Sequence, residues 1–412
     1  MRDTDHYARL LGIQTPWTVS LVELDEPELT VTIYVRIDSA VRLGCPRCQR
    51  EAPRYDARRR RWRHLDTMQF RTFIDAEVPR IECPEHGVLQ VRVPWAEDTS
   101  RYTAAFEAQV IDWLTDASTA AVARRMRLGW NAIDSIMQRA VTRGLARRTA
   151  SSPEHISVDE TSFQRRHEYV TVVTDQSSGT VLYVADNRTV ESLAGFFEGL
   201  QKPQREAIRS VSMDMWPAYI NTVRKYVPDA DERICFDKFH IAKYLSEAVD
   251  KVRRGEHKQL AAKGDQRLKK TRYRWLENPD TMKLKHWRAF EHLRDSALKT
   301  ARAWAIKEHA MCLWHYQSRT WALKQWKRWL GWAQRSRLEP VRKVATTIKT
   351  HLWGIINAIV LKRTNAAAES MNSRIQRVKA RACGFRNRQR FRTAIMFHLG
   401  GLDLYPRPEV WH

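Results

Sequence analysis

Hydrophobic and polar residues alternate along the N-terminal part of the chain. The alternation runs from Trp17 to Leu24 and again from Leu29 to Ile37, and this period of two is typical of half-buried strands. Two more strand-like segments run from Trp62 to Leu65 and from Gln69 to Val78. Residues 1–98 are therefore predicted to form a β module.

From Thr103 to Arg148 the hydrophobic residues follow a helical period instead. A short helix is expected from Ser118 to Arg125, a tight turn up to Gly129, and a second helix from Asn131 to Arg143. This is the layout of a helix-turn-helix. The pattern places four apolar residues inward and five polar residues outward: Trp130, Ile133, Ile136 and Met137 against Asn131, Asp134, Ser135, Gln138 and Arg139.

An ordinary three-helix core element is the commoner explanation of such a pattern. The arginine pairs on both sides, Arg124-Arg125 and Arg147-Arg148, favour DNA binding by residues 99–150 instead. Residues from Arg147 to Pro153 are expected to form a linker to the next domain.

Beyond this linker the hydrophobic period returns to that of strands. Strands are predicted from His155 to Val158, from Tyr169 to Thr174 and from Thr180 to Ala185, as an antiparallel meander. An amphipathic helix from Val190 to Leu200 and a strand from Ser210 to Met213 follow. Because this last connection is a crossover, we expect two acids, Asp159 and Asp214, to end neighbouring strands at one edge of a mixed sheet.

The C-terminal half of the chain is mostly helical. After a helix from Pro217 to Val227 and a strand from Glu232 to Phe236, residues 241–350 are almost entirely helical, basic and rich in tryptophan. Tryptophan at these spacings more often packs helices together than stacks on bases. A last helix is expected to open at Asn365-Ala-Ala-Ala-Glu369, with Asn372, Ser373 and Gln376 on the face of Glu369.

This order of elements predicts an α/β protein with an RNase H-like mixed sheet as its catalytic core. An all-α insertion would interrupt the core. A zinc-binding module, whose ligand pairs would be Cys45-Pro-Arg-Cys48 and Cys83-Pro-Glu-His86, and a helix-turn-helix domain would precede it. The N-terminal β hairpin and the zinc module are expected in residues 1–98, and the helix-turn-helix in residues 99–150. The first part of the core is expected in residues 151–245, the insertion in 246–350 and the second part of the core in 351–412.

The charge of the chain indicates its partner. The 412 residues contain 71 Lys and Arg against 47 Asp and Glu, a net charge of +24, which favours a polyanion. Arginine runs such as Arg58 to Arg61 and those from Arg377 to Arg392 suit phosphate or guanine. An anionic membrane surface is the alternative, but no basic segment shows a lipid-facing stripe. No apolar run reaches the roughly 18 residues of a membrane span, and no signal peptide is evident, so a cytoplasmic protein is expected.

Four residues have the spacing of a zinc site. Cys45-Pro-Arg-Cys48 and Cys83-Pro-Glu-His86 each place two ligands two residues apart, beside a turn-forming residue, which suits tetrahedral Zn²⁺. The gap of 34 residues between the pairs exceeds that of an ordinary finger, and four unrelated cysteine and histidine residues remain the alternative. Six cysteines in so long a chain do not make a disulfide framework.

Several motifs together resemble the ISL3 family of insertion-sequence transposases. The resemblance covers nearly the whole chain, and one departure is Lys238, where an arginine would be expected. The motifs are Val158-Asp-Glu160, Tyr169-Val-Thr-Val-Val-Thr-Asp175, Asp186-Asn-Arg188-Thr, Ser212-Met-Asp-Met215, Asp237-Lys-Phe-His240, Glu369-Ser-Met-Asn372 and Gly384-Phe-Arg-Asn387.

The resemblance implies a DDE transposase whose catalytic acids are Asp159, Asp214 and Glu369. These carboxylates would hold two Mg²⁺ ions, or Mn²⁺, for cleavage and transfer of DNA strands. The partners would be double-stranded DNA, as transposon ends and target, and further copies of the chain in a dimer or higher assembly on DNA. The N-terminal domains would recognise the terminal inverted repeats.

Some residues keep two interpretations. Asp237 and His240 could line the catalytic site or make a structural hydrogen bond that anchors the insertion. Contacts to the phosphates of the transferred or target strand are expected from a basic segment after the Glu369 helix, with Arg381, Arg386, Arg388 and Arg390. Cys235, Cys312 and Cys383 are interpreted as small buried residues.

Two other functions fit the same sequence. A transposase-derived protein could bind specific DNA without catalysis, as a repressor or architectural factor. An RNase H-like nuclease could cut DNA without joining strands, although it would not need a helix-turn-helix and a zinc module.

Overall fold

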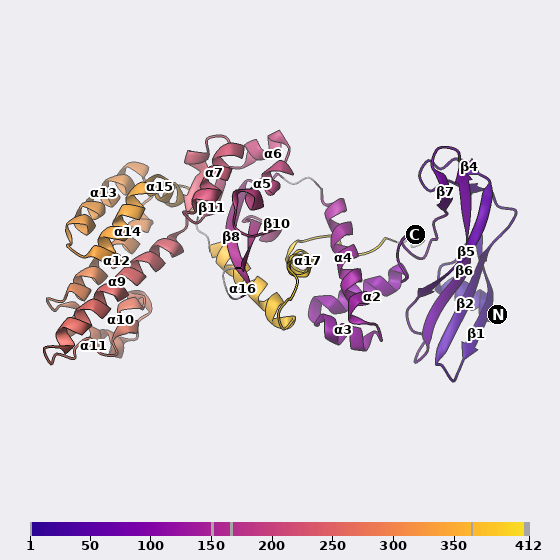
Figure 1. Ribbon diagram of the computed structural model, residues 1–412, viewed down its shortest axis with the longest axis horizontal. Helices are drawn as coiled ribbons and strands as arrows, with labels where there is room; N and C mark the ends of the chain where they lie inside the picture. Colours follow the sequence, from indigo (N-terminus) through magenta and orange to yellow (C-terminus); the bar gives the residue numbers. More distant parts are fainter. Residues whose placement is uncertain (1, 150–151, 165–167, 364–365, 408–412) are drawn as a thin grey trace. The chain divides into compact units, whose positions relative to one another are not determined.

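The structure is a computed structural model that describes residues 2–149, 152–164, 168–363 and 366–407 (Figure 1). The chain divides into two compact units. The first contains the described residues of 1–149, 380–384 and 401–412, and the second those of 150–379 and 385–400. The finer domain boundaries at 98, 245 and 350 remain predictions, and residues 150–151 of the expected linker lie outside the described residues.

The first unit begins with helix α1 (Asp3–Leu10) and a twisted sheet. The sheet has the order β1-β2-β6-β5, and β7 pairs with β6. The β2 and β6 strands are parallel, and the other pairs are antiparallel. Its strands and those of a small separate hairpin are β1 (Trp17–Asp25), β2 (Thr30–Ile37), β3 (Leu43–Gly44), β4 (Glu51–Ala52), β5 (Arg54–Arg63), β6 (Arg71–Cys83) and β7 (Gly87–Gln90). The predicted strands in β1, β2 and β6 are confirmed.

The β5 strand begins eight residues earlier than the Trp62 to Leu65 prediction. Arg58 to Arg61 therefore lie on a strand. The reason is that β5 is an edge strand whose first residues are exposed on both faces, so no apolar alternation marks them. Charged side chains on an edge strand also prevent pairing with another sheet. Only its end is buried, where Trp62 enters the core with Ile33 and Ile74.

Three helices follow in the first unit, as predicted: α2 (Ala104–Asp116), α3 (Thr119–Arg125) and α4 (Trp130–Arg147). The hydroxyls of Thr103 and Ser118 accept hydrogen bonds from Phe106 N and Ala121 N and so cap α2 and α3. The turn before α4 contains Arg127 in the left-handed region, with φ of 53°.

The second unit contains a five-stranded mixed sheet of order β10-β9-β8-β11-β12. The strands are β8 (His155–Gln164), β9 (Glu168–Asp175), β10 (Thr180–Asp186), β11 (Ser210–Met213) and β12 (Ile234–Phe236). The first three form the predicted antiparallel meander, and β8, β11 and β12 are parallel neighbours. The helices between the strands are α5 (Val190–Glu198), α6 (Lys202–Ala207), α7 (Pro217–Tyr226) and α8 (Ala230–Arg233).

Between β12 and the last two helices, residues 238–360 form helices and short 3-10 turns. These are α9 (Lys238–Ala261), α10 (Arg272–Leu276), η1 (Pro279–Thr281), α11 (Leu284–Arg294), α12 (Lys299–Cys312), η2 (Leu313–His315), α13 (Arg319–Arg335), α14 (Glu339–Thr350) and α15 (Leu352–Val360). Trp275, Trp326 and Trp329 are fully buried among them, which confirms their packing role, whereas Trp321 is 54% exposed. The α15 helix packs on β12 through Gly354, where a Cβ would lie 2.5 Å from the ring of Phe236.

The chain ends with α16 (Ala366–Arg381) and α17 (Arg388–Leu399), drawn in yellow in Figure 1. Asn365, where this helix was predicted to open, lies outside the described residues. The α16 helix lies against β8, because Gln376 Nε2 donates to Thr161 Oγ1 at 2.9 Å and Lys379 Nζ to the carbonyl of Ser162 at 3.0 Å. In the parts of the chain that the structure describes, no helix is long and apolar enough to cross a membrane.

Candidate functional site

The four predicted zinc ligands come together between β3, β4 and the β6–β7 turn. The thiol of Cys45 lies 3.8 Å from His86 Nδ1, and that of Cys83 lies 3.6 Å from the same nitrogen. Cys48 Sγ and Cys83 Sγ are 3.8 Å apart, and all four ligand atoms lie within 4.8 Å of one another. A tetrahedron with Zn–S bonds of about 2.3 Å has edges of about 3.8 Å. The donor set and its spacing therefore fit a structural zinc site.

The backbone around this cluster favours a thiolate. Burial raises the pKa of the Cys45 thiol, but the N–H groups of Cys48 and Arg47 point at its sulfur. Together with the neighbouring thiols they lower its pKa to about 6. Gly44 sits close to the carbonyl of Gln49, and Gln49 has a positive φ of 62°, so the knuckle is a tight turn that aims these N–H groups inward. Cys45 can therefore lose its proton near neutral pH, as a metal ligand must.

Three aspartates lie in one row across the sheet of the second unit. The β8–β11 pairing matches Ser157 with Ser212, and the β11–β12 pairing matches Met213 with Phe236. Asp159 and Asp214 each lie two residues beyond the first of these pairs, and Asp214 and Asp237 each lie one residue beyond the second. The registers, continued past the ends of β11 and β12, therefore put the three aspartates level with one another. Adjacent strands are about 4.8 Å apart, and level residues of parallel strands share a face. The three carboxylates thus belong to one face of the sheet.

Asp159 does not end its strand, which corrects the prediction. The β8 strand continues to Gln164 in its pairing with β9, whereas β11 stops at Met213. The site therefore lies beside the middle of β8, where the shorter parallel strands end. The residues of β8 beyond Asp159 are partly apolar and pair with β9 in a long hairpin. The hydrophobic pattern around Val158 did not indicate that the strand continues.

The carboxylate of Asp159 is held at both oxygens. Its Oδ1 accepts from Glu160 N at 2.8 Å, and its Oδ2 accepts from the Asn372 side chain at 2.8 Å. Burial raises the pKa of Asp159 to about 7, and the nearby charges of Glu160 and Asp237 add to this. An acid that is costly to ionise becomes easier to ionise when a cation binds beside it.

Asp237 and His240 make the structural hydrogen bond that was one of their two interpretations, and they also lie beside Asp214. Asp237 caps α9, because its Oδ1 accepts from Phe239 N at 3.1 Å, and its Oδ2 lies 3.0 Å from His240 Nδ1. His240 Nε2 lies 3.9 Å from Asp214 Oδ2. Burial lowers the pKa of His240, but the bond to Asp237 and the charge of Asp214 outweigh it and raise that pKa. The pair both anchors α9 and faces the aspartate row.

Glu369 lies near this row on α16. Burial and the charge of Asp237 raise the pKa of Glu369, while His240 lowers it, so these groups are within electrostatic range. Glu369 is exposed and precedes Asn372 by one helical turn, which puts both residues on one face of α16. Among the described residues, no hydrogen bond or ion pair joins Glu369 to Asp159 or Asp214.

A further charged pair beside the row was not predicted. The Arg188 guanidinium donates to Glu160 Oε1 at 2.7 Å and stacks 3.9 Å above the Trp216 ring. The indole of Trp216 in turn donates to the carbonyl of Arg188 at 3.1 Å. Burial raises the pKa of Glu160, Arg188 lowers it, and Asp214 raises it further. Glu160 and Arg188 belong to two motifs noted in the sequence, Val158-Asp-Glu160 and Asp186-Asn-Arg188-Thr, but only the fold brings these two side chains together.

The second helix of the helix-turn-helix presents part of the expected surface. Asn131, Ser135 and Gln138 are exposed on α4. Two orientations were wrong: Asp134 is 7% exposed, and Trp130 is 40% exposed. Trp130 is the first residue of α4, where the helix has barely entered the core. Asp134 is among the buried residues of α4, and its Oδ2 accepts a 2.8 Å hydrogen bond from the side chain of Gln138.

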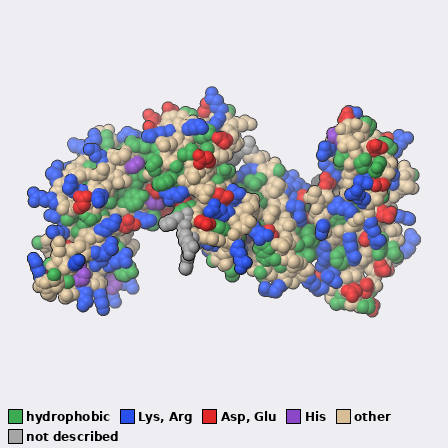
Figure 2. Space-filling view, in the orientation of Figure 1, with side chains coloured by type: hydrophobic (Ala, Val, Ile, Leu, Met, Phe, Trp, Pro, Cys, Tyr) green, Lys and Arg blue, Asp and Glu red, His purple; other side chains and the backbone are tan. Residues whose placement is uncertain are grey.

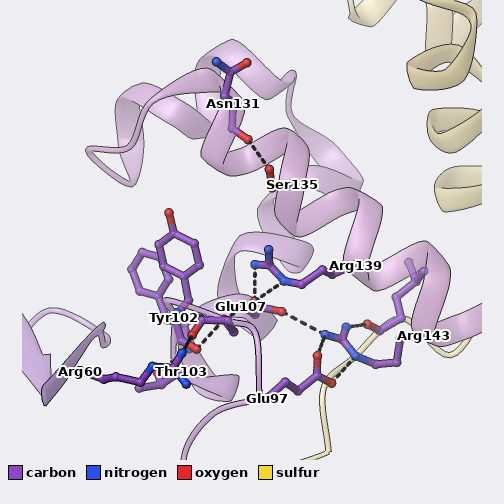
Figure 3. A network of polar contacts seen from close by, with 12 residues as sticks. Arg60, Glu97, Tyr102, Thr103, Glu107, Asn131, Ser135, Arg139 and Arg143 are labelled. Carbon is purple, nitrogen blue, oxygen red and sulfur yellow. Dashed lines mark hydrogen bonds and ion pairs between the residues drawn. The ribbon is translucent and has the colours of Figure 1, made fainter. Parts of the chain in front are cut away.

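Arg139 does not face outward as predicted. Figure 3 shows Arg139 and Arg143 of α4 pointing at Glu107 of α2, with Asn131 and Ser135 farther along the helix. Glu107 is 1% exposed and accepts from Arg139 Nε at 3.0 Å and Arg143 Nη2 at 3.0 Å. A buried carboxylate needs such partners, so the guanidinium of Arg139 holds α2 and α4 together.

The chain after α17 also packs on α4. Arg143 Nη1 donates to the carbonyl of Leu404 at 2.5 Å, and Arg147 Nη1 donates to that of Tyr405 at 2.6 Å. A Cβ on Gly144 would lie 2.7 Å from Cβ of Leu402. Residues 402–405 therefore belong to the first unit, which the sequence did not predict.

The predicted C-terminal arginines have different surroundings. Arg381 Nη1 donates to the carbonyl of Thr115 at 2.5 Å. Arg388 contacts Asn187 Oδ1 at 3.1 Å and Glu168 Oε2 at 3.3 Å. Arg386 is exposed, and Arg390 is half-buried. Of the three other cysteines, only Cys235 is buried, and Cys312 and Cys383 are exposed, which corrects that interpretation.

Three family models match this chain. The model described as the ISL3 transposase matches residues 156–395, the helix-turn-helix domain of transposase family ISL3 matches residues 91–141, and the zinc-finger of transposase IS204/IS1001/IS1096/IS1165 matches residues 42–86. The transposase for insertion sequence element IS1557 of Mycobacterium tuberculosis is 30% identical, over 97% of this chain and 96% of the relative. The transposase for insertion sequence element IS1001 of Bordetella parapertussis is 26% identical, over 89% of this chain and 91% of that relative.

Proposed function

The chain belongs to the ISL3 family of insertion-sequence transposases, and from this premise we propose that Asp159, Asp214 and Glu369 form its catalytic site. One observation carries the proposal. Asp159 lies in β8, Asp214 directly follows the adjacent parallel strand β11, and α16, which bears Glu369, is hydrogen-bonded to Asp159 through Asn372.

We infer that the mixed sheet is an RNase H-like core. An antiparallel meander followed by two parallel strands, with an acid on the first strand and another after the fourth, supports this assignment. On the same inference, the all-α insertion of residues 246–350 comprises most of α9 and the helices from α10 to α14.

Carboxylate oxygens in this arrangement suit hard divalent cations such as Mg²⁺ or Mn²⁺. When bound, two such ions would activate the attacking oxygen and neutralise the charge of the scissile phosphate. Asp159, Asp214 and Glu369 would hold them. Asn372 keeps Asp159 turned toward α16, and His240 sits between Asp214 and Asp237, where it offsets the repulsion of the acids before a cation binds.

DNA recognition belongs to the first unit in this proposal. Asn131, Ser135 and Gln138, which are exposed on α4, would contact base edges at the terminal repeats. Zinc held by the Cys45 cluster would fix the β module. The partner is double-stranded DNA in the bacterial cytoplasm, at the nucleoid, and the working form is a dimer or a higher assembly on DNA.

A reporter gene placed between the two DNA segments that border the transposase gene tests this function in cells. With the intact chain, the reporter is expected to appear at new chromosomal sites. The Asp214→Asn chain should give none while it still protects the bordering DNA from nuclease digestion. Reporter movement with Asp214→Asn would overturn the assignment, and cutting without insertion would instead indicate a nuclease.

A further inference from the structure

Positive charge is concentrated in the helical segment. Residues 246–350 contain 26 Lys and Arg against 10 Asp and Glu, so this quarter of the chain carries 16 of the 24 net charges. Figure 2 shows Lys and Arg side chains over the surface of these helices with few Asp and Glu among them. Neither the proposed catalytic site nor the helix-turn-helix accounts for this charge.

Some cations of this segment form ion pairs with acidic neighbours. Arg253, Arg254 and Arg272 surround Asp250. On α14, Arg342 and Lys343 both pair with Glu339, at 3.8 and 3.6 Å. These helices balance part of their own charge, as ordinary solvated surfaces do.

Helix α13 differs from them because its 17 residues include no Asp or Glu. One face, with Ala322, Trp326, Trp329, Leu330 and Ala333, is buried. The opposite face carries Trp321, Lys324, Lys327 and Arg328, and all four are exposed. Among the described residues, no ion pair joins Lys324, Lys327 or Arg328 to an acid. We call these four residues the α13 outer face.

The arrangement of the α13 outer face suits a polyanion. Residues three and four apart lie on neighbouring turns, so the three cations fall within about 6 Å along the helix axis. Lys324 Nζ lies 5.0 Å from the ring centre of Trp321, so the face combines apolar surface with charge. Cations this close repel one another, and a phosphate backbone would relieve the repulsion.

We propose that the α13 outer face binds the sugar-phosphate backbone of duplex DNA, as a contact additional to the helix-turn-helix. This rests on the DNA-binding function of the family. A second copy of this chain is a poor partner for the face, because its own net charge is +24. A lipid surface is also a poor partner, since Trp321 is the single large apolar side chain among the four.

The salt dependence of binding tests the proposal. The full-length chain with Lys324→Gln, Lys327→Gln and Arg328→Gln is compared with the wild type on a short duplex of unrelated sequence, without divalent metal. Each phosphate contact contributes about 0.9 to the slope of log affinity against log salt concentration, so the triple variant should lose up to about 2.7 of that slope. We expect affinity at low salt to fall about tenfold or more.

A matched variant separates a local contact from general charge. Lys202→Gln, Arg209→Gln and Lys225→Gln remove the same charge from exposed positions of the second unit outside α13, and the slope should stay near the wild-type value. An unchanged slope in the α13 variant, or equal losses in both variants, would overturn the proposal. Because no cleavage is measured, the result is independent of whether Asp159, Asp214 and Glu369 are catalytic.

Discussion

The side-chain amide of Asn372 on α16 donates a 2.8 Å hydrogen bond to Oδ2 of Asp159 on β8. One turn later, Gln376 reaches Thr161, two residues farther along the strand. A helical turn rises about 5.4 Å and two strand residues span about 6.7 Å, so helix and strand remain side by side over both contacts. Glu369, one turn before Asn372, is thereby brought to the face that bears Asp159.

Asn372→Ala should leave the fold intact and weaken catalysis. Asp159 would lose the donor that orients it, and loss of such outer partners typically costs about 10- to 100-fold in metal affinity or activity. The concentration of Mg²⁺ needed for half-maximal cleavage should rise. Ser373→Ala, an exposed neighbour on the same helix, is the control. Equal Mg²⁺ requirements for the two variants would assign Asn372 no positioning role.

Asp159→Asn should change stability in a pH-dependent way. The pKa of Asp159 is raised to about 7, against about 3.9 when unfolded, so the protonated form is favoured in the folded chain. Stability from this group is complete below about pH 4 and is lost as pH rises to about 7.

Without divalent metal, Asp159→Asn should therefore be more stable than the wild type at pH 8, by about 1–3 kcal/mol, and equal to it near pH 4. Thermal unfolding at both pH values measures this. Mg²⁺ at pH 8 should stabilise the wild type and not the variant. A variant less stable than the wild type at pH 8 would contradict the raised pKa.

Zinc removal should unfold the β module. Small zinc sites contribute roughly 10 kcal/mol or more to the folding of their module. A chelator, or Cys83→Ser, is expected to abolish the melting transition of the β module and to release one zinc per chain. Cys312→Ser changes an exposed thiol and should retain the metal. Wild-type zinc content in Cys83→Ser would rule out this ligand.

Glu107→Ala should destabilise the helix-turn-helix. Glu107 pairs with both Arg139 and Arg143, and Arg143 keeps its pair with Glu97 at 2.6 Å when Glu107 is removed, so we expect a loss of about 1–3 kcal/mol. Chemical denaturation measures the change. Glu51→Ala breaks an exposed pair with Arg42 and should cost less than about 1 kcal/mol. Similar losses in both variants would mean that the Figure 3 network contributes little.

Elements with a clear hydrophobic period were predicted better from the sequence than elements whose residues are nearly all polar. The β8–β9–β10 meander and the helices around Gly129 follow from local spacing. Local spacing also marks the two ligand pairs of the Cys45 cluster, which the fold brings together across a gap of 34 residues. The beginning of β5 was missed because exposed arginines show no alternation. The inward turn of Arg139 was missed because its partner, Glu107, lies 32 residues away on another helix.

The candidate site shows the same division. Resemblance identified Asp159, Asp214 and Glu369, and strand order predicted that the two aspartates are neighbours. Local pattern could not show that β8 extends past Asp159, since this depends on pairing with β9 alone. It also could not reveal that Arg188 joins Glu160 to Trp216, because three separate segments form that contact.

Single-turnover cleavage of a labelled transposon end, taken from the DNA that borders the gene, tests the central claim most directly. Wild type and the Asp159→Asn, Asp214→Asn and Glu369→Gln chains are compared in Mg²⁺ and in Mn²⁺, after equal binding of the end is established. The account predicts that each substitution lowers the cleavage rate by about a thousandfold or more, the scale of losing an essential catalytic group. Cleavage within about tenfold of wild type by any one of the three chains would contradict it.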